Sequence, residues 1–235
     1  MDSASQISSV NLVLPYTGWD VAVNPGTLMM TLVAFGVVLV LGRAFSLRLQ
    51  PVPGRRQALG EMLILSFDDM ISQSLGREGR QFLPLILTLF LFVLVSNWMT
   101  VIPFLNGPTR DLNTTLALAL IVLVVAHSSA IKKKGFARYI RAYFEPFWFM
   151  FPSNVFSEVS KTASHAFRLF GNVFAGGVVI AVVPVILWQL FKWFGFGLSL
   201  VVMPGLNGFF GIFIGGVQAF VFAMLALAYI SVLRE

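Results

Sequence analysis

Long apolar runs alternate with short polar connections along the chain. The runs at 25–47, 82–102 and 115–131 predict membrane spans, because about 20 apolar residues cross the hydrocarbon core of a bilayer. Two later runs, 154–191 and 198–233, are far longer. As helices they would reach about 50 to 55 Å, against a core about 30 Å thick. We therefore expect two consecutive, strongly tilted helices that form an antiparallel pair.

Between the first two spans, apolar and acidic side chains mix over 57–75, which predicts an amphipathic helix at the membrane interface. Residues 1–24 are interpreted as a polar to interfacial N-terminal segment. The fold class is thus an all-α integral membrane protein, a single membrane domain over 1–235. It has about five membrane helices plus the interfacial helix.

Composition agrees, since 57% of the residues are hydrophobic and 11% are charged, against about 25% charged in soluble domains. The chain has no cysteine and two histidines, which excludes disulfides and thiolate sites and leaves too few ligands for a histidine-built metal site. A GxxxxGK[ST] phosphate-binding loop is also absent. We expect no metal, no cofactor and no nucleotide site.

The net charge of +6 comes from lysines and arginines gathered in short loops, mainly 43–80 and 132–141. That pattern sets membrane topology and does not point to nucleic acid. With both loops in the cytoplasm, the N-terminus lies outside and the C-terminus inside. Splitting 154–191 into two spans would put Arg234 outside, so one tilted helix is preferred.

A polar stripe runs along the fourth apolar element. Its residues are spaced by 3, 4, 3 and 4, the spacing of one helix face: Glu158, Lys161, His165, Arg168 and Asn172, with Ser164 beside them. A charge at bilayer depth costs about 2.5 to 3.5 kcal/mol and is usually functional. The alternative is an arginine that snorkels from a helix end. The stripe points at water, at a partner helix or at another subunit's charge.

In the last apolar run, Gln218 is the one strongly polar residue near the middle, and Asn207 and Tyr229 fall near the same face. A glutamine there is either a bond between helices or a functional group. Small residues suggest close packing against the preceding long helix. They are Gly208, Gly211, Gly215, Gly216 and Ala219.

The run SEVSKTASHAFRLFGNVFAG, 157–176, strongly resembles the signature of subunit a (subunit 6) of F-type ATP synthases. Three more stretches, 82–103, 108–119 and 217–231, resemble the same family in the family's order. The resemblance implies a membrane Fo stator that faces the rotating ring of c subunits and carries ions through two half-channels. Arg168 would face the ring carboxylates and block a direct leak, while Asn172 and Gln218 would line the ion path.

The implied partners are the c ring, the b subunits of the peripheral stalk and, through the stalk, the F1 catalytic head. The surroundings would be a lipid bilayer, most simply a bacterial inner (plasma) membrane. The chain would then be a non-catalytic component of a rotary ATPase. A self-contained secondary transporter is one rival reading, and a structural scaffold in which Arg168 forms a salt bridge with Glu158 or a similar residue is another.

Departures from the family pattern matter. Two positions that often carry ionisable groups are Gly177 and Gly211 here, Thr162 stands where proline is common, and His165 where an apolar residue is common. We hypothesise that His165, Glu158 and Ser164, with water, take over part of the ion path. The alternative is that His165 only bonds a neighbouring helix. Proton and sodium coupling both stay open.

Overall fold

The computed structural model describes residues 10–13, 20–46, 54–102, 105–145 and 147–234. Five of its helices are long and apolar enough to cross a membrane, which confirms the predicted helical membrane fold. One short antiparallel ribbon precedes them, made of β1 (Val10–Val13) and β2 (Asp20–Val23), with Val10 opposite Val23. The rest of the N-terminal segment 1–24, apart from Asn24, lies outside the described residues.

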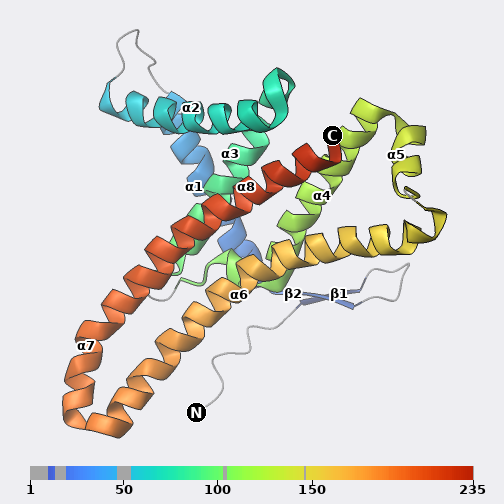
Figure 1. Ribbon diagram of the computed structural model, residues 1–235. Coiled ribbons are helices and arrows are strands. Elements are labelled where there is room, and N and C mark those ends of the chain that lie inside the picture. The colour runs from blue at the N-terminus through green and yellow to red at the C-terminus, as the bar shows by residue number, and fades with distance from the viewer. Residues whose placement is uncertain (1–9, 14–19, 47–53, 103–104, 146, 235) are drawn as a thin grey trace.

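The first two spans are joined through a helix that crosses their ends. Figure 1 shows α2 (Arg55–Leu75) lying across the ends of α1 (Pro25–Ser46) and α3 (Leu83–Met99). A turn of 3₁₀ helix, η1 (Gly76–Phe82), leads from α2 into α3. Phe67 and Ile71 of α2 are buried, whereas several other apolar side chains of this helix remain exposed. Such a helix suits the membrane interface.

The third span is α4 (Leu112–Lys134), which follows the short turn η2 (Pro108–Arg110). It begins where the Asp111 carboxylate accepts the backbone N–H of Asn113 at 2.9 Å, an N-cap that satisfies one free donor. It ends at three lysines, which favour a helix C-terminus electrostatically, followed by Gly135 at φ 83°. Then come α5 (Phe136–Ala142) and η3 (Trp148–Met150).

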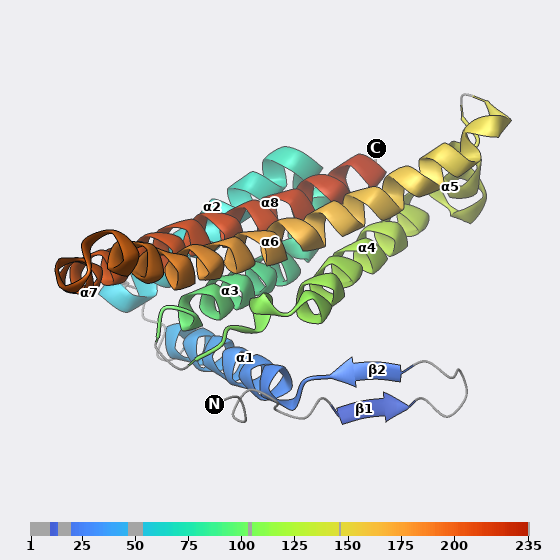
Figure 2. The ribbon, with the colours of Figure 1, turned by 90° about the horizontal axis from the view of Figure 1, so that it is seen from below.

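Two long helices complete the fold and run side by side in both Figure 1 and Figure 2. The first, α6 (Phe151–Phe191), is a single helix of 41 residues despite Pro184, about 60 Å at 1.5 Å per residue. After a turn at Lys192, the chain returns through α7 (Trp193–Asn207), the π-helical η4 (Gly208–Ile214) and α8 (Gly215–Arg234). The length of α6 requires tilt in a bilayer.

Gly211 of η4 and Gly215 of α8 pack closely against the end of α3 and the turn that follows it, not against α6. A Cβ on Gly211 would lie 2.2 Å from Val101 Cγ2, and one on Gly215 would lie 3.0 Å from Asn97 Cβ. Asn97 is buried and donates to the Gly215 carbonyl at 3.0 Å. For these two glycines, the expectation of packing against the preceding long helix is therefore wrong.

The end of α8 is tied to two other elements. Arg234 is buried, forms an ion pair with Glu78 of η1 at 2.9 Å and donates to Ser129 of α4 at 2.9 Å. Its guanidinium also lies 5.3 Å from the centre of the Phe82 ring. These contacts anchor the carboxyl-terminal end of α8 to η1 and α4.

Candidate functional site

The polar stripe of α6 faces α8. Because the two helices are antiparallel, residues at helical spacing on one meet residues at helical spacing on the other. They meet at three levels, which are Glu158 with Tyr229, His165 with Phe222, and Asn172 with Gln218. Arg168 lies between the second and the third level.

Glu158 holds the first level. Its carboxylate accepts a hydrogen bond from the Tyr229 hydroxyl and forms an ion pair with Lys161 at 2.8 Å. The Glu158 side chain is 14% exposed and that of Lys161 is 50% exposed. Glu158 therefore has its own partners. The scaffold reading needs a salt bridge from Arg168 to Glu158 or a similar residue, and the described residues contain none.

His165 holds the second level. Its ring lies over Phe222 with 4.0 Å between ring centres. Its Nε2 is buried and has no hydrogen-bond partner among the described residues. A bond from Nε2 to a neighbouring helix is thus absent there, and the ring lines a cavity instead.

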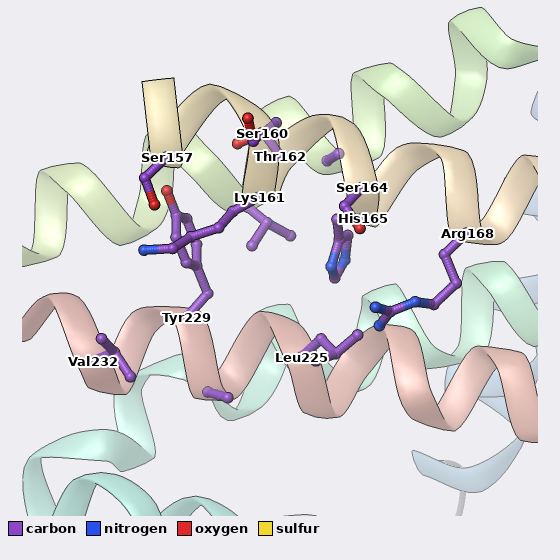
Figure 3. A pocket seen from close by; sticks show the side chains of 13 residues that line it. Ser157, Ser160, Lys161, Thr162, Ser164, His165, Arg168, Leu225, Tyr229 and Val232 are labelled. Carbon is purple, nitrogen blue, oxygen red and sulfur yellow. The ribbon is translucent and has the colours of Figure 1, made fainter. Parts of the chain in front are cut away.

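Arg168 reaches from α6 toward α8, close to Leu225 (Figure 3). The residue is exposed. Within the described part of the chain the ion pairs are Arg80–Asp68, Lys161–Glu158 and Arg234–Glu78, so no carboxylate pairs with Arg168. Since arginine stays protonated in proteins, this is a fixed charge that can receive a carboxylate from outside the chain.

Asn172 and Gln218 form the third level. The Asn172 amide donates to Gln218 Oε1 at 3.3 Å. Gln218 thus forms a hydrogen bond between helices, which was one of the two interpretations of this residue. Asn172 follows Arg168 by one helical turn, so it lies on the same face of α6 as Arg168.

Two adjoining cavities lie on the amino-terminal side of Arg168. The large cavity has a volume of about 490 Å³ and lies between α4, α6 and α8 (Figure 3). Its polar lining comes mostly from α6: Ser157, Ser160, Lys161, Thr162, Ser164, His165 and Arg168. The Glu158 cavity, of about 260 Å³, shares Ser157, Lys161 and Val232 with it. Tyr139 lines the Glu158 cavity, and burial, with a hydrogen bond to Tyr143, raises its pKa, so it stays a neutral hydroxyl.

A third hollow, the Arg110 cavity, lies on the carboxyl-terminal side of Arg168 and has a volume of about 200 Å³. From α6 it is lined by Asn172, Gly176, Gly177 and Ile180. Asn207 and Gly211 face it from the returning long segment α7–η4–α8, and Arg110 faces it from η2.

The sequence analysis assigned no role to Arg110, because no residue near it in the sequence indicates a contact with Gly177. A role for Tyr229 could have been predicted, because its spacing places it near the same helix face as Gln218.

Fold and site together define a multi-pass helical membrane protein with a polar seam between α6 and α8. The family model described as ATP synthase A chain matches residues 27–231. The chain therefore belongs to the ATP synthase subunit a family, part of the membrane Fo sector.

Individual relatives agree with the family model. ATP synthase subunit a of Moorella thermoacetica is 35% identical, over 92% of this chain and 91% of its own length. That of Desulforamulus reducens is 36% identical, over 89% and 79%. The chloroplastic subunit a of Stigeoclonium helveticum is 34% identical, over 96% and 92%.

Proposed function

We propose that this chain is the ion-translocating stator of a rotary ATP synthase, in which Arg168 faces the carboxylates of a c ring. The observation that carries the proposal is an exposed guanidinium with no carboxylate partner in the described chain, placed between cavities on both sides. A fixed positive charge stabilises the ionised form of a carboxylate that comes near it, and so favours release of the bound ion.

The cavities are the proposed half-channels. The large cavity and the Glu158 cavity together form one, with Glu158, Ser164 and His165 along it. The Arg110 cavity forms the other, with Asn172 at its inner end. Because Arg168 stands between them along α6, an ion has to pass from one to the other on the ring. Each elementary charge that crosses 100 mV releases about 2.3 kcal/mol, which a direct leak would waste.

The proposal includes the surroundings of the chain. The partners are the c ring, the b subunits of the peripheral stalk and, through them, the F1 head. In a bacterial plasma membrane the N-terminus lies outside and the C-terminus lies in the cytoplasm, following the basic loops. The half-channel at Glu158 then opens to the cytoplasm, and the Arg110 cavity opens to the outside.

The test is ATP-driven ion uptake into inverted membrane vesicles that carry the whole complex, with and without Na⁺. Arg168→Ala should reduce uptake by at least about 100-fold, because the charge that holds each ring carboxylate is lost. Arg138→Ala is the matched control, since Arg138 is an exposed arginine on α5. Dependence of uptake on Na⁺ in the unaltered complex would identify sodium as the ion.

Normal pumping by the Arg168→Ala complex would overturn the stator proposal. The transporter reading would then be tested by purification, because a stator copurifies with a stoichiometric ring of small hydrophobic subunits and a secondary transporter does not.

A further inference from the structure

The Arg110 cavity contains a single charged side chain. Apart from Arg110, its polar lining consists of amides and one hydroxyl, those of Asn97, Asn106, Asn172, Asn207 and Thr100. No carboxylate, histidine, lysine or tyrosine lines it among the described residues. An ion that crosses this cavity therefore travels with water and does not bind to a side chain that can change its protonation.

Arg110 stands on a backbone that is built into the core. Pro108 and Thr109 of η2 are fully buried, and the Thr109 hydroxyl donates to Asn97 Oδ1 at 2.8 Å. A Cβ on Gly107 would lie 2.2 Å from the Ser96 carbonyl oxygen, so only glycine allows this close approach. The start of the Arg110 side chain is thereby fixed relative to α3.

The guanidinium lies beside Gly177 of α6. A Cβ at Gly177 would be 3.6 Å from Arg110 Nη2 and 3.8 Å from its Cζ, which is ordinary contact. Nη1 donates to Asn106 Oδ1 at 3.2 Å. The adjacent carboxylate, Asp111, is engaged in capping α4, and no ion pair holds Arg110 in the described chain. On α6, the charged residue that precedes Gly177 is Arg168, which is also positive.

We propose that Arg110 is the electrostatic gate of this half-channel, with its guanidinium set beside position 177 of α6. Its fixed charge raises the ion concentration needed to fill the path from this side, without taking part in the transfer itself. The inference rests on the proposed stator function and adds to it the residue that sets the affinity of one half-channel. A unit charge a few ångströms from a cation in a hydrated cavity changes its occupancy about threefold to tenfold.

The experiment uses the whole complex reconstituted into liposomes with the F1 head outside, so that the Arg110 side faces the lumen. Initial rates of ATP synthesis are measured at a fixed membrane potential while the lumenal pH is varied, or lumenal Na⁺ if the complex is sodium-coupled. Arg110→Gln should reach its half-maximal rate at an ion concentration about threefold to tenfold lower, which for protons is about 0.5 to 1 pH unit higher. Its maximal rate should change by less than about twofold, and Arg110→Lys should retain the original midpoint, because the charge stays.

A second pair of variants leaves Arg110 in place. Gly177→Glu sets a carboxylate against the guanidinium and neutralises it, so its midpoint should shift in the same direction as that of Arg110→Gln. Gly177→Gln is the neutral control of the same size and should not shift. This pair decides the matter if Arg110→Gln does not assemble.

The inference is overturned if Arg110→Gln assembles with an unaltered midpoint, if Arg110→Lys shifts as far as Arg110→Gln, or if Gly177→Gln shifts like Gly177→Glu. Arg168→Ala in the same liposomes separates this failure from that of the proposed function. If Arg168→Ala loses synthesis and Arg110→Gln keeps its midpoint, the gate proposal is wrong and the stator proposal stands. Synthesis by Arg168→Ala would remove the stator itself.

Discussion

The two ends of the seam between α6 and α8 are built from different chemistry. At the amino-terminal end of α6, Glu158 meets Tyr229 and His165 meets Phe222, and several ionisable side chains line the two adjoining cavities. At the carboxyl-terminal end, amides and glycines surround one fixed guanidinium. On the proposed ion path, a proton could rest on side chains at the first end, whereas at the second an ion would stay with water.

Because the two ends differ in chemistry, substitutions at each end should have different effects on ion transport. Changes at the Glu158 end remove groups that can hold or pass a proton, so they should alter rates and the shape of a pH profile. Changes at the Arg110 end alter only a local potential, so they should move a midpoint and leave the shape unaltered. The predictions below test the Glu158 end and then the Asn172–Gln218 bond, from the largest expected effect to the smallest.

Glu158→Gln should slow ATP-driven ion uptake about tenfold, because it removes the one carboxylate of the Glu158 cavity that lies on the α6 stripe. The shape of the side chain is retained, so the Tyr229 hydroxyl still has an acceptor. Partly exposed ion pairs contribute only about 0 to 1 kcal/mol to stability. The amount of assembled complex should therefore stay nearly normal, and the loss reports on transport. Initial uptake rates in inverted vesicles provide the measurement.

Lys161 offers the control for this variant. If Glu158 only neutralised Lys161, then Glu158→Gln combined with Lys161→Gln would restore uptake. A double variant as slow as Glu158→Gln alone supports a carboxylate on the ion path. Uptake by Glu158→Gln within about twofold of the original would contradict a role for Glu158, since general acid–base groups contribute far more than that.

His165→Leu should have a smaller effect, lowering uptake about threefold between about pH 6 and pH 8, because one of the side chains that could pass a proton is lost. Leucine can still pack on Phe222, so the main loss is the imidazole in the wall of the large cavity. His127→Leu is the matched control: His127 lies on α4, outside the lining of the large cavity, with its Nε2 3.3 Å from the Tyr143 hydroxyl. An unaltered rate across this pH range in His165→Leu would rule out the relay.

The elements and the stripe could be predicted because their signals are local. Hydrophobic length gives the spans, and the spacing from Glu158 to Asn172 places the stripe on one helix face without knowledge of the neighbours. The over-long runs indicate tilt by arithmetic alone. The ribbon β1–β2 was missed, because four-residue apolar runs are ambiguous between strand and interfacial segment.

The contacts between distant segments could not be predicted in the same way. Glycine spacing shows that something packs closely, but only the tertiary structure shows that Gly211 meets Val101 and not the other long helix. Arg110 and Gly177 meet for the same reason, through the fixed position of η2 on α3. The departure at Gly177 was visible in the sequence, while the guanidinium beside it was not.

The smallest expected effect concerns the bond between Asn172 and Gln218, which joins α6 to α8. Asn172→Ala, Gln218→Ala and the double variant form a cycle whose coupling free energy of unfolding should be about 0.5 kcal/mol, because hydrogen bonds between membrane helices average about 0.6 kcal/mol. The bond is also long, at 3.3 Å. Unfolding of the purified chain in mixed micelles measures the coupling, and uptake is measured on the same variants in the complex.

A coupling near zero together with a large loss of uptake in each single variant would show that both amides act on the ion or on Arg168. Their mutual hydrogen bond would then be incidental. A coupling above about 2 kcal/mol would instead make the pair a structural clasp of the seam, since it would exceed the strongest such bonds.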